Sequence, residues 1–273
     1  MKQLEQRFRV LVNRLRDGYF RRTTRRLQAD LKQALQKCEA EIPVLIVSYN
    51  NASYVQSMTE QLNRYGIKPI VIDNRSTDRA SIATLEKLHA SEKAEVVFSE
   101  KNYGYLVGFI NPVYELLPQY FAYSDPDLLL NEKLPDDFLV TMKRLTDTYR
   151  VFKAGFALEI REGLQSATIT KQIGYPKMIR KTYDFREWEA QYWRFEIKHP
   201  TLKLYAARVD TTFAVCNKKY YFDEFYDGIR VGGDFSAIHL PWYPDLDIMS
   251  AEERRVYLQG NNSTTSIPDA KRP

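Results

Sequence analysis

Three apolar segments of this sequence end in polar clusters whose side chains could bind a ligand. The clusters are Ser48-Tyr49-Asn50, DNRSTD (73–78) and SDPD (124–127). In an open parallel α/β sheet, ligands bind outside the carboxyl ends of the strands. If the three segments are neighbouring strands, their polar ends share one edge of the sheet. The sequence therefore predicts a ligand site at this edge, with ordinary strand ends followed by helix caps as the alternative.

Asp125 and Asp127 flank a single proline. In an extended segment their side chains would point the same way, because strand side chains alternate. Two hard oxygen ligands so placed suit a divalent ion that also holds a diphosphate, such as Mg²⁺ or Mn²⁺. Asp-Pro-Asp is equally good turn chemistry, so a plain turn is the alternative. Asp73 could accept hydrogen bonds from a ribose or a base, whereas Ser76 and Asp78 could cap the next helix.

Alternating β and α segments must position these side chains. We expect strands at 44–47, 68–73, 94–98 and 120–125, and another at 210–216. Apolar residues at helical spacing fall between them, at 54–65, 82–88 and 138–149. This series predicts an α/β fold with an open, mostly parallel sheet and flanking helices.

These motifs together resemble the nucleotide-sugar-binding half of family two glycosyltransferases, which have the GT-A fold. IPVLIVSYNN, VIDNRSTD, KNYGYLVGFIN and SDPDLLL follow the order of the family over about residues 42–140. The resemblance implies a nucleotide-sugar donor and a divalent metal, Mn²⁺ or Mg²⁺, held by Asp125 and Asp127. The donor-binding residues that it implies are Ser48, Tyr49, Asn50, Asp73, Arg75, Asn102, Gly104 and Asp125.

The sequence departs from the family pattern in two ways. Arg75 occupies a place often held by glycine, which would add a positive charge near the phosphates. The Glu-Asp element that carries the catalytic base in the family is not evident downstream. QYWRF (191–195) is similar to the Gln-x-x-Arg-Trp signature of processive members, but it lies too close to Asp-x-Asp, and we interpret it as a chance match.

An inverting transferase needs a carboxylate that takes the proton from the acceptor hydroxyl. Asp210 opens DTTFAVC, and Asp234 follows two glycines that would permit a close approach. Both are catalytic candidates, and Asp210 is favoured as an acceptor-site residue. Either could instead be an ordinary cap or turn residue.

His239 lies between apolar residues in AIHLPWYPD. It is either a hydrogen-bonded core histidine or, as the resemblance to GT-A enzymes implies, a third protein ligand to the metal. Trp242 would then be placed to stack on a sugar face, and we expect Tyr243 beside it in the acceptor site.

The first forty residues carry the positive charge of the chain. The net charge is +5, and residues 1–40 hold eleven Lys or Arg against four Asp or Glu. The body is therefore nearly neutral and gives no indication of a nucleic-acid partner. Residues 3–38 have helical periodicity, with Leu4, Phe8, Leu11 and Leu15 on one face. This helix could pack on the body, pair with a second copy in a homodimer, or rest on an anionic membrane surface.

The bulk composition indicates one sizeable domain with appendages. We expect a helical extension (1–40), a GT-A domain (41–260, with a nucleotide-sugar half at 41–150 and an acceptor half at 151–260) and a flexible tail (261–273). Two cysteines without a C-x-x-C pair argue against disulfides and zinc clusters. With no apolar run of 18 residues, we expect a cytoplasmic protein, free or peripheral on the inner face of the membrane.

The sequence thus predicts a metal-dependent glycosyltransferase that moves a sugar to a glycan or glycolipid with inversion, as in polysaccharide or lipopolysaccharide synthesis. One alternative is a nucleotidyltransferase, but SYNNASY (48–54) lacks the glycines and lysines of its phosphate loop. The other is a non-catalytic scaffold that acts through its basic helix.

Overall fold

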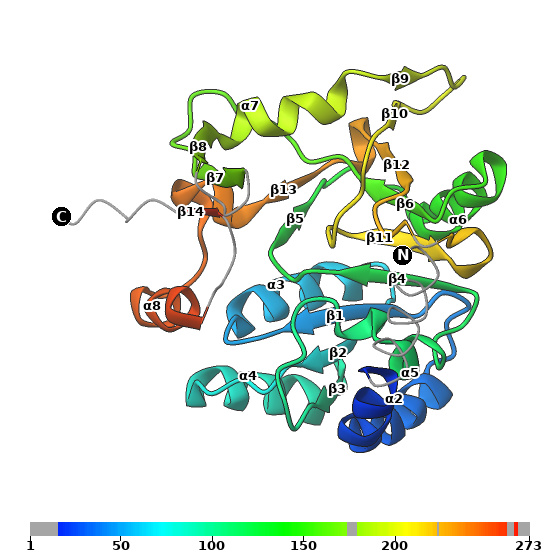
Figure 1. The fold of residues 1–273 in the computed structure, drawn as a ribbon, viewed down its shortest axis with the longest axis vertical. Helices are drawn as coiled ribbons and strands as arrows, with labels where there is room; N and C mark the ends of the chain where they lie inside the picture. Colours follow the sequence, from blue (N-terminus) through cyan, green and yellow to red (C-terminus); the bar gives the residue numbers. More distant parts are fainter. Residues whose placement is uncertain (1–15, 174–178, 223, 261–264, 267–273) are drawn as a thin grey trace, which may run out of the picture.

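The computed structural model describes residues 16–173, 179–222, 224–260 and 265–266. A nine-stranded sheet, in the order β3-β2-β1-β4-β11-β6-β12-β10-β9, runs through the molecule (Figure 1). Its strands are β1 (Val44–Ser48), β2 (Ile70–Asp73), β3 (Glu95–Phe98), β4 (Tyr120–Ser124), β6 (Lys153–Phe156), β9 (Glu196–Ile197), β10 (Leu204–Ala206), β11 (Ala214–Asn217) and β12 (Gly228–Val231). Both halves of the predicted domain therefore contribute to one sheet.

Strand direction confirms the predicted fold class. Strands β3, β2, β1 and β4 are parallel, β11 is antiparallel between β4 and β6, and β6 is parallel to β12. The result is an open, mostly parallel α/β sheet with flanking helices. Strand β11 begins at Ala214, later than predicted, because Thr211 accepts a hydrogen bond from the Asp125 N–H (2.9 Å) and so belongs to a loop.

Helices cover both faces of the sheet, because the apolar strands alternate between two cores. In β1, Val44 and Ile46 join the core under α3 (Ala52–Asn63), α4 (Arg79–Ala90) and α6 (Phe138–Tyr149). Leu45 and Val47 join the opposite core under α2 (Arg25–Lys37) and α5 (Asn111–Tyr114). This two-sided burial explains why β1 has no polar residue before Ser48.

Helix α2 packs on the body. Its residues Leu27, Leu31 and Ala34 are buried, and Lys37 forms a 2.7 Å ion pair with Glu95 of β3. Residues 16–23 are also helical, and Arg21 forms a 2.8 Å ion pair with Glu115. Of the three arrangements that the sequence left open for the helix, this part adopts packing on the body. Leu4, Phe8, Leu11 and Leu15 lie outside the described residues.

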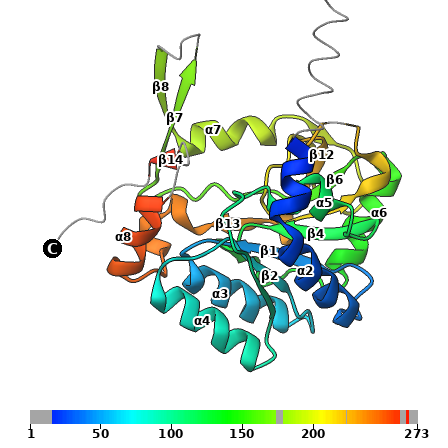
Figure 2. The same cartoon turned by 60° about the horizontal axis from the view of Figure 1, so that its bottom comes forward.

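Smaller elements surround the sheet. Strands β5 (Leu128–Leu130) and β13 (Ala237–His239) form a two-stranded ladder. The hairpin of β7 (Thr168–Ile173) and β8 (Ile179–Asp184) stands out from the body beside α7 (Phe185–Ala190) (Figure 2). Within the predicted tail, β14 (Thr265–Ser266) pairs with β7, whereas 261–264 and 267–273 lie outside the described residues.

Helix α8 (Ala251–Gly260) is fixed to the start of α3. The Glu253 carboxylate accepts a 2.9 Å hydrogen bond from the Ser53 N–H, and Arg254 pairs with Asp247 at 2.8 Å. In the part of the chain that the structure describes, no helix has the length and apolar character needed to cross a membrane.

Candidate active site

A cleft of about 570 Å³ opens at the carboxyl ends of the parallel strands. The predicted site residues that line it are Ser48, Tyr49, Asn102, Gly104, Asp125, Asp127, Asp210, His239 and Trp242. The predicted site residues that do not line it are Asn50, Asp73, Arg75, Asp234 and Tyr243. Residues far apart in the sequence therefore meet at the edge where the polar strand ends predict a ligand site.

The β5–β13 ladder brings His239 to Asp127. Antiparallel pairing sets His239 opposite Leu128, and the Leu240 N–H donates to the Asp127 carbonyl at 2.9 Å. As a result, His239 Nε2 lies 3.5 Å from Asp127 Oδ2. Trp242 packs against the imidazole, with ring centroids 4.3 Å apart, and limits its movement.

The Asp127–His239 pair has unused ligand atoms. Asp127 Oδ1 and His239 Nδ1 are buried without a hydrogen-bond partner in the described residues. Burial lowers the pKa of His239, which favours the neutral imidazole that binds metals. Buried polar atoms are rarely left unpaired in native proteins, so this corner fits a bound cation. Within the described ranges no group of three His, Cys, Asp or Glu forms a ready-made metal site.

Asp125 is tied to the loop before β11. Its Oδ2 accepts a hydrogen bond from the Thr211 hydroxyl, and its N–H donates to the Thr211 carbonyl at 2.9 Å. Burial, followed by the nearby charge of Asp127, raises the pKa of Asp125 well above its ordinary value, and the Thr211 hydrogen bond opposes this rise. A cation or a positively charged partner in the cleft would therefore favour the ionised form of Asp125.

Asp210 is exposed at the cleft, and its carboxylate has no hydrogen-bond partner in the described residues. Its backbone is fixed from below, because the buried Lys153 Nζ donates to the carbonyls of Val209 (3.2 Å) and Asp210 (3.0 Å). The arrangement presents a solvated carboxylate on a loop whose main chain is fixed.

Asn50 and Asp73 are buried and organise the loop after β2. The Asn50 Oδ1 accepts hydrogen bonds from the N–H groups of Thr77 (2.7 Å) and Asp78 (3.0 Å). The Asp73 carboxylate accepts from the N–H and the hydroxyl of Ser76. Asp78 caps α4 through the Ser81 N–H (2.7 Å), as its alternative interpretation predicts. These side chains shape the cleft edge without lining it.

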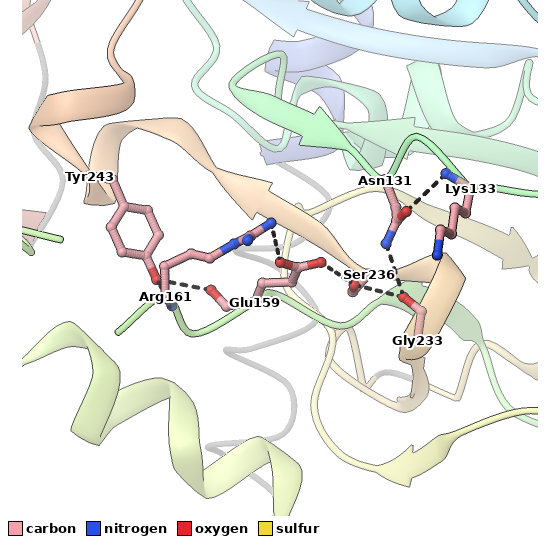
Figure 3. A network of polar contacts seen from close by, with 7 residues as sticks. All are labelled: Asn131, Lys133, Glu159, Arg161, Gly233, Ser236 and Tyr243. Carbon is pink, nitrogen blue, oxygen red and sulfur yellow. Dashed lines mark hydrogen bonds and ion pairs between the residues drawn. The ribbon is translucent and has the colours of Figure 1, made fainter. Parts of the chain in front are cut away.

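Tyr243 and the neighbourhood of Asp234 belong to a polar network beside the cleft (Figure 3). The Tyr243 hydroxyl accepts from the Arg161 N–H (2.6 Å) and donates to the Glu159 carbonyl (3.0 Å). Tyr243 is fully buried, so its contacts are structural. Ser236 donates to Glu159 (2.6 Å) and to the Gly233 carbonyl (2.8 Å), which fixes the turn that carries the exposed Asp234.

Several cleft residues were not among the predicted site residues. They are Val47, Asn51, Asn74, Tyr105, Pro126, Leu158, Trp188, Glu189, Tyr192, Thr211, Thr212, Arg230, Pro241 and Tyr257. Asn74 could have been found within DNRSTD, because it follows Asp73 directly. Its amide binds Gly104 O (2.7 Å) and the Tyr103 N–H (3.0 Å), and it thus fixes the loop that carries Asn102. The high content of aromatic residues in 182–196 is the feature of the sequence that could have identified Trp188 and Tyr192 as cleft residues.

No family model and no curated protein matches the sequence. Among solved structures, residues 1–349 of S. aureus TarS are similar at 16% identity and a TM-score of 0.34, over 48% of this chain and 41% of that one. The chain thus spans about two fifths of that TarS fragment. TarS has also been solved in complex with UDP-GlcNAc.

Two further similar structures contain manganese. The mannosyltransferase PcManGT from Pyrobaculum calidifontis, in complex with GDP-Man and Mn²⁺, is 13% identical with a TM-score of 0.42, over 88% of this chain and 80% of that one. GalNAc-T7 with UDP, GalNAc and Mn²⁺ is 13% identical with a TM-score of 0.44, over 79% and 48%. All these TM-scores are below 0.5, so the function has to be inferred from the site itself.

Proposed function

We propose that this protein is a metal-dependent glycosyltransferase that moves a sugar from a nucleotide-sugar donor to a hydroxyl of a glycan or glycolipid, with inversion. The observation that carries the proposal is the Asp127–His239 pair. Asp127 Oδ1 is buried without a hydrogen-bond partner in the described residues, and Asp127 Oδ2 faces His239 Nε2 at 3.5 Å. The pair lies at the cleft beside Asp125, at the carboxyl edge of a parallel sheet.

The donor would lie along the ends of β1 and β4. Ser48, Tyr49, Asn102 and Gly104 line this part of the cleft and would contact the nucleoside. Gly104 has a φ of 80°, a conformation that glycine adopts without strain, so the loop can approach the ligand closely. The diphosphate would then face Asp125 and Asp127.

Asp127 and His239, with Asp125 beside them, would hold Mn²⁺ or Mg²⁺. A divalent cation bound there would neutralise charge on the departing diphosphate. The protein side chains fix the direction of the donor, because the ladder between β5 and β13 and the Thr211 contact hold this corner on two sides.

Asp210 would act as the general base. Its carboxylate takes the proton from the acceptor hydroxyl while the acceptor oxygen bonds to the anomeric carbon. The bond from that carbon to the diphosphate oxygen breaks on the opposite face, which inverts the configuration. Trp242 is buried with its ring against Phe185 and His239, so it would hold the His239 imidazole in place instead of stacking on a sugar, as the sequence suggested.

A panel of nucleotide sugars, measured by thermal shift with Mn²⁺ or with EDTA, tests this function. The right donor should raise the melting temperature in a metal-dependent way, following RT ln(1 + [L]/Kd). Asp127→Asn should lose this metal-dependent stabilisation and the turnover with it. The control is Asp136→Asn, an exposed aspartate outside the cleft, which should behave as wild type. Unchanged metal-dependent turnover in Asp127→Asn would contradict the assignment.

We also propose a peripheral attachment to anionic membranes. The apolar face of α2 is buried on the body, whereas Arg16, Arg22, Arg25 and Lys32 are exposed. Each such cation near an anionic leaflet contributes about 1 kcal/mol. Sedimentation with phosphatidylserine vesicles should show binding at low salt that is lost at high salt and in Arg22→Glu/Arg25→Glu.

A further inference from the structure

A buried ion pair lines the cleft, and the chemistry proposed above makes no use of it. Arg230 of β12 is 3% exposed and Glu189 of α7 is 1% exposed, and both line the cleft. Arg230 Nη1 bonds to Glu189 Oε1, and Arg230 Nε donates to the Arg208 carbonyl at 2.8 Å. The pair joins α7 to the sheet at the cleft surface.

Fixing α7 to the sheet does not require charges. Removing two ions from water is costly, and an apolar pair of similar volume often stabilises a fold as well or better. Here burial raises the pKa of Glu189 to about 7, against the opposing effect of Arg230. The presence of the pair at a cleft surface therefore indicates a recognition role beyond packing.

Aromatic rings complete this part of the cleft. The Arg230 guanidinium lies 4.1 Å from the centroid of the Tyr192 ring, and the ring centroids of Trp188 and Tyr192 are 6.4 Å apart. Both aromatic residues line the cleft. Flat apolar rings beside a few fixed polar groups suit a ligand with apolar faces and hydroxyl edges.

The position of these residues separates them from the donor. In the sheet, β12 is divided from β1 by β4, β11 and β6. The proposed donor contacts lie at β1, and the Asp125–Asp127 corner follows β4. A molecule on α7 and β12 would therefore approach the metal corner from the side opposite the nucleoside, past Asp210.

We propose that Trp188, Glu189, Tyr192 and Arg230 form the acceptor subsite and bind a neutral pyranose ring. The ring lies on the aromatic side chains, and its hydroxyls bond to Glu189 and Arg230. An anionic acceptor is disfavoured by Asp125, Asp127 and Asp210, which line the same cleft. This inference rests on the proposed function, because it assigns the second substrate of the same site.

Double substitution separates recognition from structure. Glu189→Met/Arg230→Met replaces the pair by apolar side chains of similar length and should keep α7 in place, whereas Arg230→Met alone leaves a buried carboxylate unpaired and should destabilise the fold. The matched control is Arg186→Ala. It breaks the partly exposed Arg186–Asp184 pair (2.8 Å) at the start of α7, away from the cleft.

Three quantities are measured: the donor Kd by calorimetry, the melting temperature, and the kinetics of transfer to an acceptor. The acceptors are nitrophenyl glycosides of neutral hexoses, a nitrophenyl glucuronide and a serine peptide. The double variant should keep the donor Kd and lose roughly 30-fold or more in kcat/KM for the neutral acceptor, mostly through KM. Arg186→Ala should keep wild-type acceptor kinetics.

Three results would overturn the subsite: unchanged acceptor KM in the double variant, an equal loss in Arg186→Ala, or a wild-type preference for the glucuronide or the peptide. Failure of the proposed function looks different, because wild type would then bind no nucleotide sugar. The subsite is still tested in that case by tryptophan fluorescence with methyl hexosides. Binding that the double substitution removes supports the subsite, and no binding by wild type overturns it.

Discussion

Arg75 adopts a left-handed backbone conformation, with a φ of 64°. The resemblance to the transferase family puts glycine at this position, and the conformation gives the reason, since a Cβ is strained there. The side chain is exposed and does not line the cleft. We therefore expect Arg75→Gly to raise the free energy of unfolding by about 0.5 kcal/mol. The substitution relieves backbone strain in the folded state, and this gain exceeds the loss caused by the greater conformational freedom of glycine in the unfolded chain.

Arg75→Ala is the control for that prediction. It removes the same guanidinium but keeps the Cβ, so it should not gain stability. Urea denaturation measures the stability, and calorimetry measures the donor Kd. If both variants weaken donor binding several-fold, the arginine does contact the phosphates, as the sequence suggests.

His239 is the residue at which a core role and a ligand role can be distinguished. Its Nε2 faces Asp127 Oδ2 at 3.5 Å, which favours the ligand role. We expect His239→Ala to weaken Mn²⁺ binding at least ~10-fold, together with donor binding. Paramagnetic relaxation of water protons measures the bound Mn²⁺. A lower melting temperature with unchanged metal affinity would instead identify a core histidine.

At the scale of elements, α2 is one of the helices that pack on the sheet and stabilise the fold. Leu31 is 0% exposed and lies on the core formed with Leu45, Val47 and Ile72. Leu31→Ala should therefore lower the free energy of unfolding by about 3 kcal/mol. The exposed Lys32→Ala on the same helix should change it by less than about 0.5 kcal/mol. Equal effects in urea denaturation would show that the helix is not packed in solution.

Helix and cleft are linked through the loop that carries Asn102. The Tyr103 hydroxyl donates to the Thr23 carbonyl, and Arg26 binds Glu100 at 3.4 Å. Tyr103→Phe removes one hydrogen bond at the helix, two residues before Tyr105 of the cleft. We expect donor binding to weaken, with a Kd about 3-fold higher, and the melting temperature to change little, because one hydrogen bond is worth about 1 kcal/mol. An unchanged Kd would mean that the loop holds its position without the helix.

At the scale of the whole molecule, Lys153 lies buried at the centre of the sheet. Burial lowers its pKa to about 8, against the opposing effects of Cys216, Asp210 and Asp125. Cys216 is itself neutral, because burial raises the pKa of its thiol to about 12. Between about pH 8 and the ordinary lysine value, the unfolded chain binds a proton that the folded protein lacks.

The Cys216 thiol acts in the opposite direction, because it ionises near pH 9 in the unfolded chain and stays neutral in the folded protein. The lysine effect is therefore measured in a Cys216→Ala background, where stability should rise with pH across this window, by up to about 3 kcal/mol over its full width. Urea denaturation between pH 7.5 and 9.5, below the titration of unfolded tyrosine, measures the first part of this rise. Cys216→Ala/Lys153→Met is the control and should show no such slope. A stability of Cys216→Ala that falls with pH over the same range would contradict the buried, weakly basic lysine.

The fold could be predicted because its strands carry their signal locally. The apolar runs of β1, β2, β3 and β4 each end where the polar cluster begins, and burial on both faces leaves no alternation to misread. The Asp127–His239 pair could be predicted from the sequence for the same reason, since each residue lies in a short distinctive motif. Tyr243 was placed in the cleft because it follows Trp242, yet neighbouring side chains here face different ways.

The Glu189–Arg230 pair shows what local reasoning misses. Glu189 lies in a short charged helix and Arg230 in a strand, and neither position is unusual by itself. Their meeting is a tertiary contact between α7 and β12, two segments far apart in the sequence. Such a pair can be found only once the packing of the elements is known.

The pairing of β5 with β13 also determines when the site can exist during synthesis. Asp127 leaves the ribosome long before His239, and β5 has no ladder partner until β13 has followed it. A nascent chain that ends before residue 237 would therefore contain the whole β1–β4 region but lack the histidine side of the metal corner. Under the proposed function, newly made protein could therefore hold the cation at this corner only after most of its length has been translated.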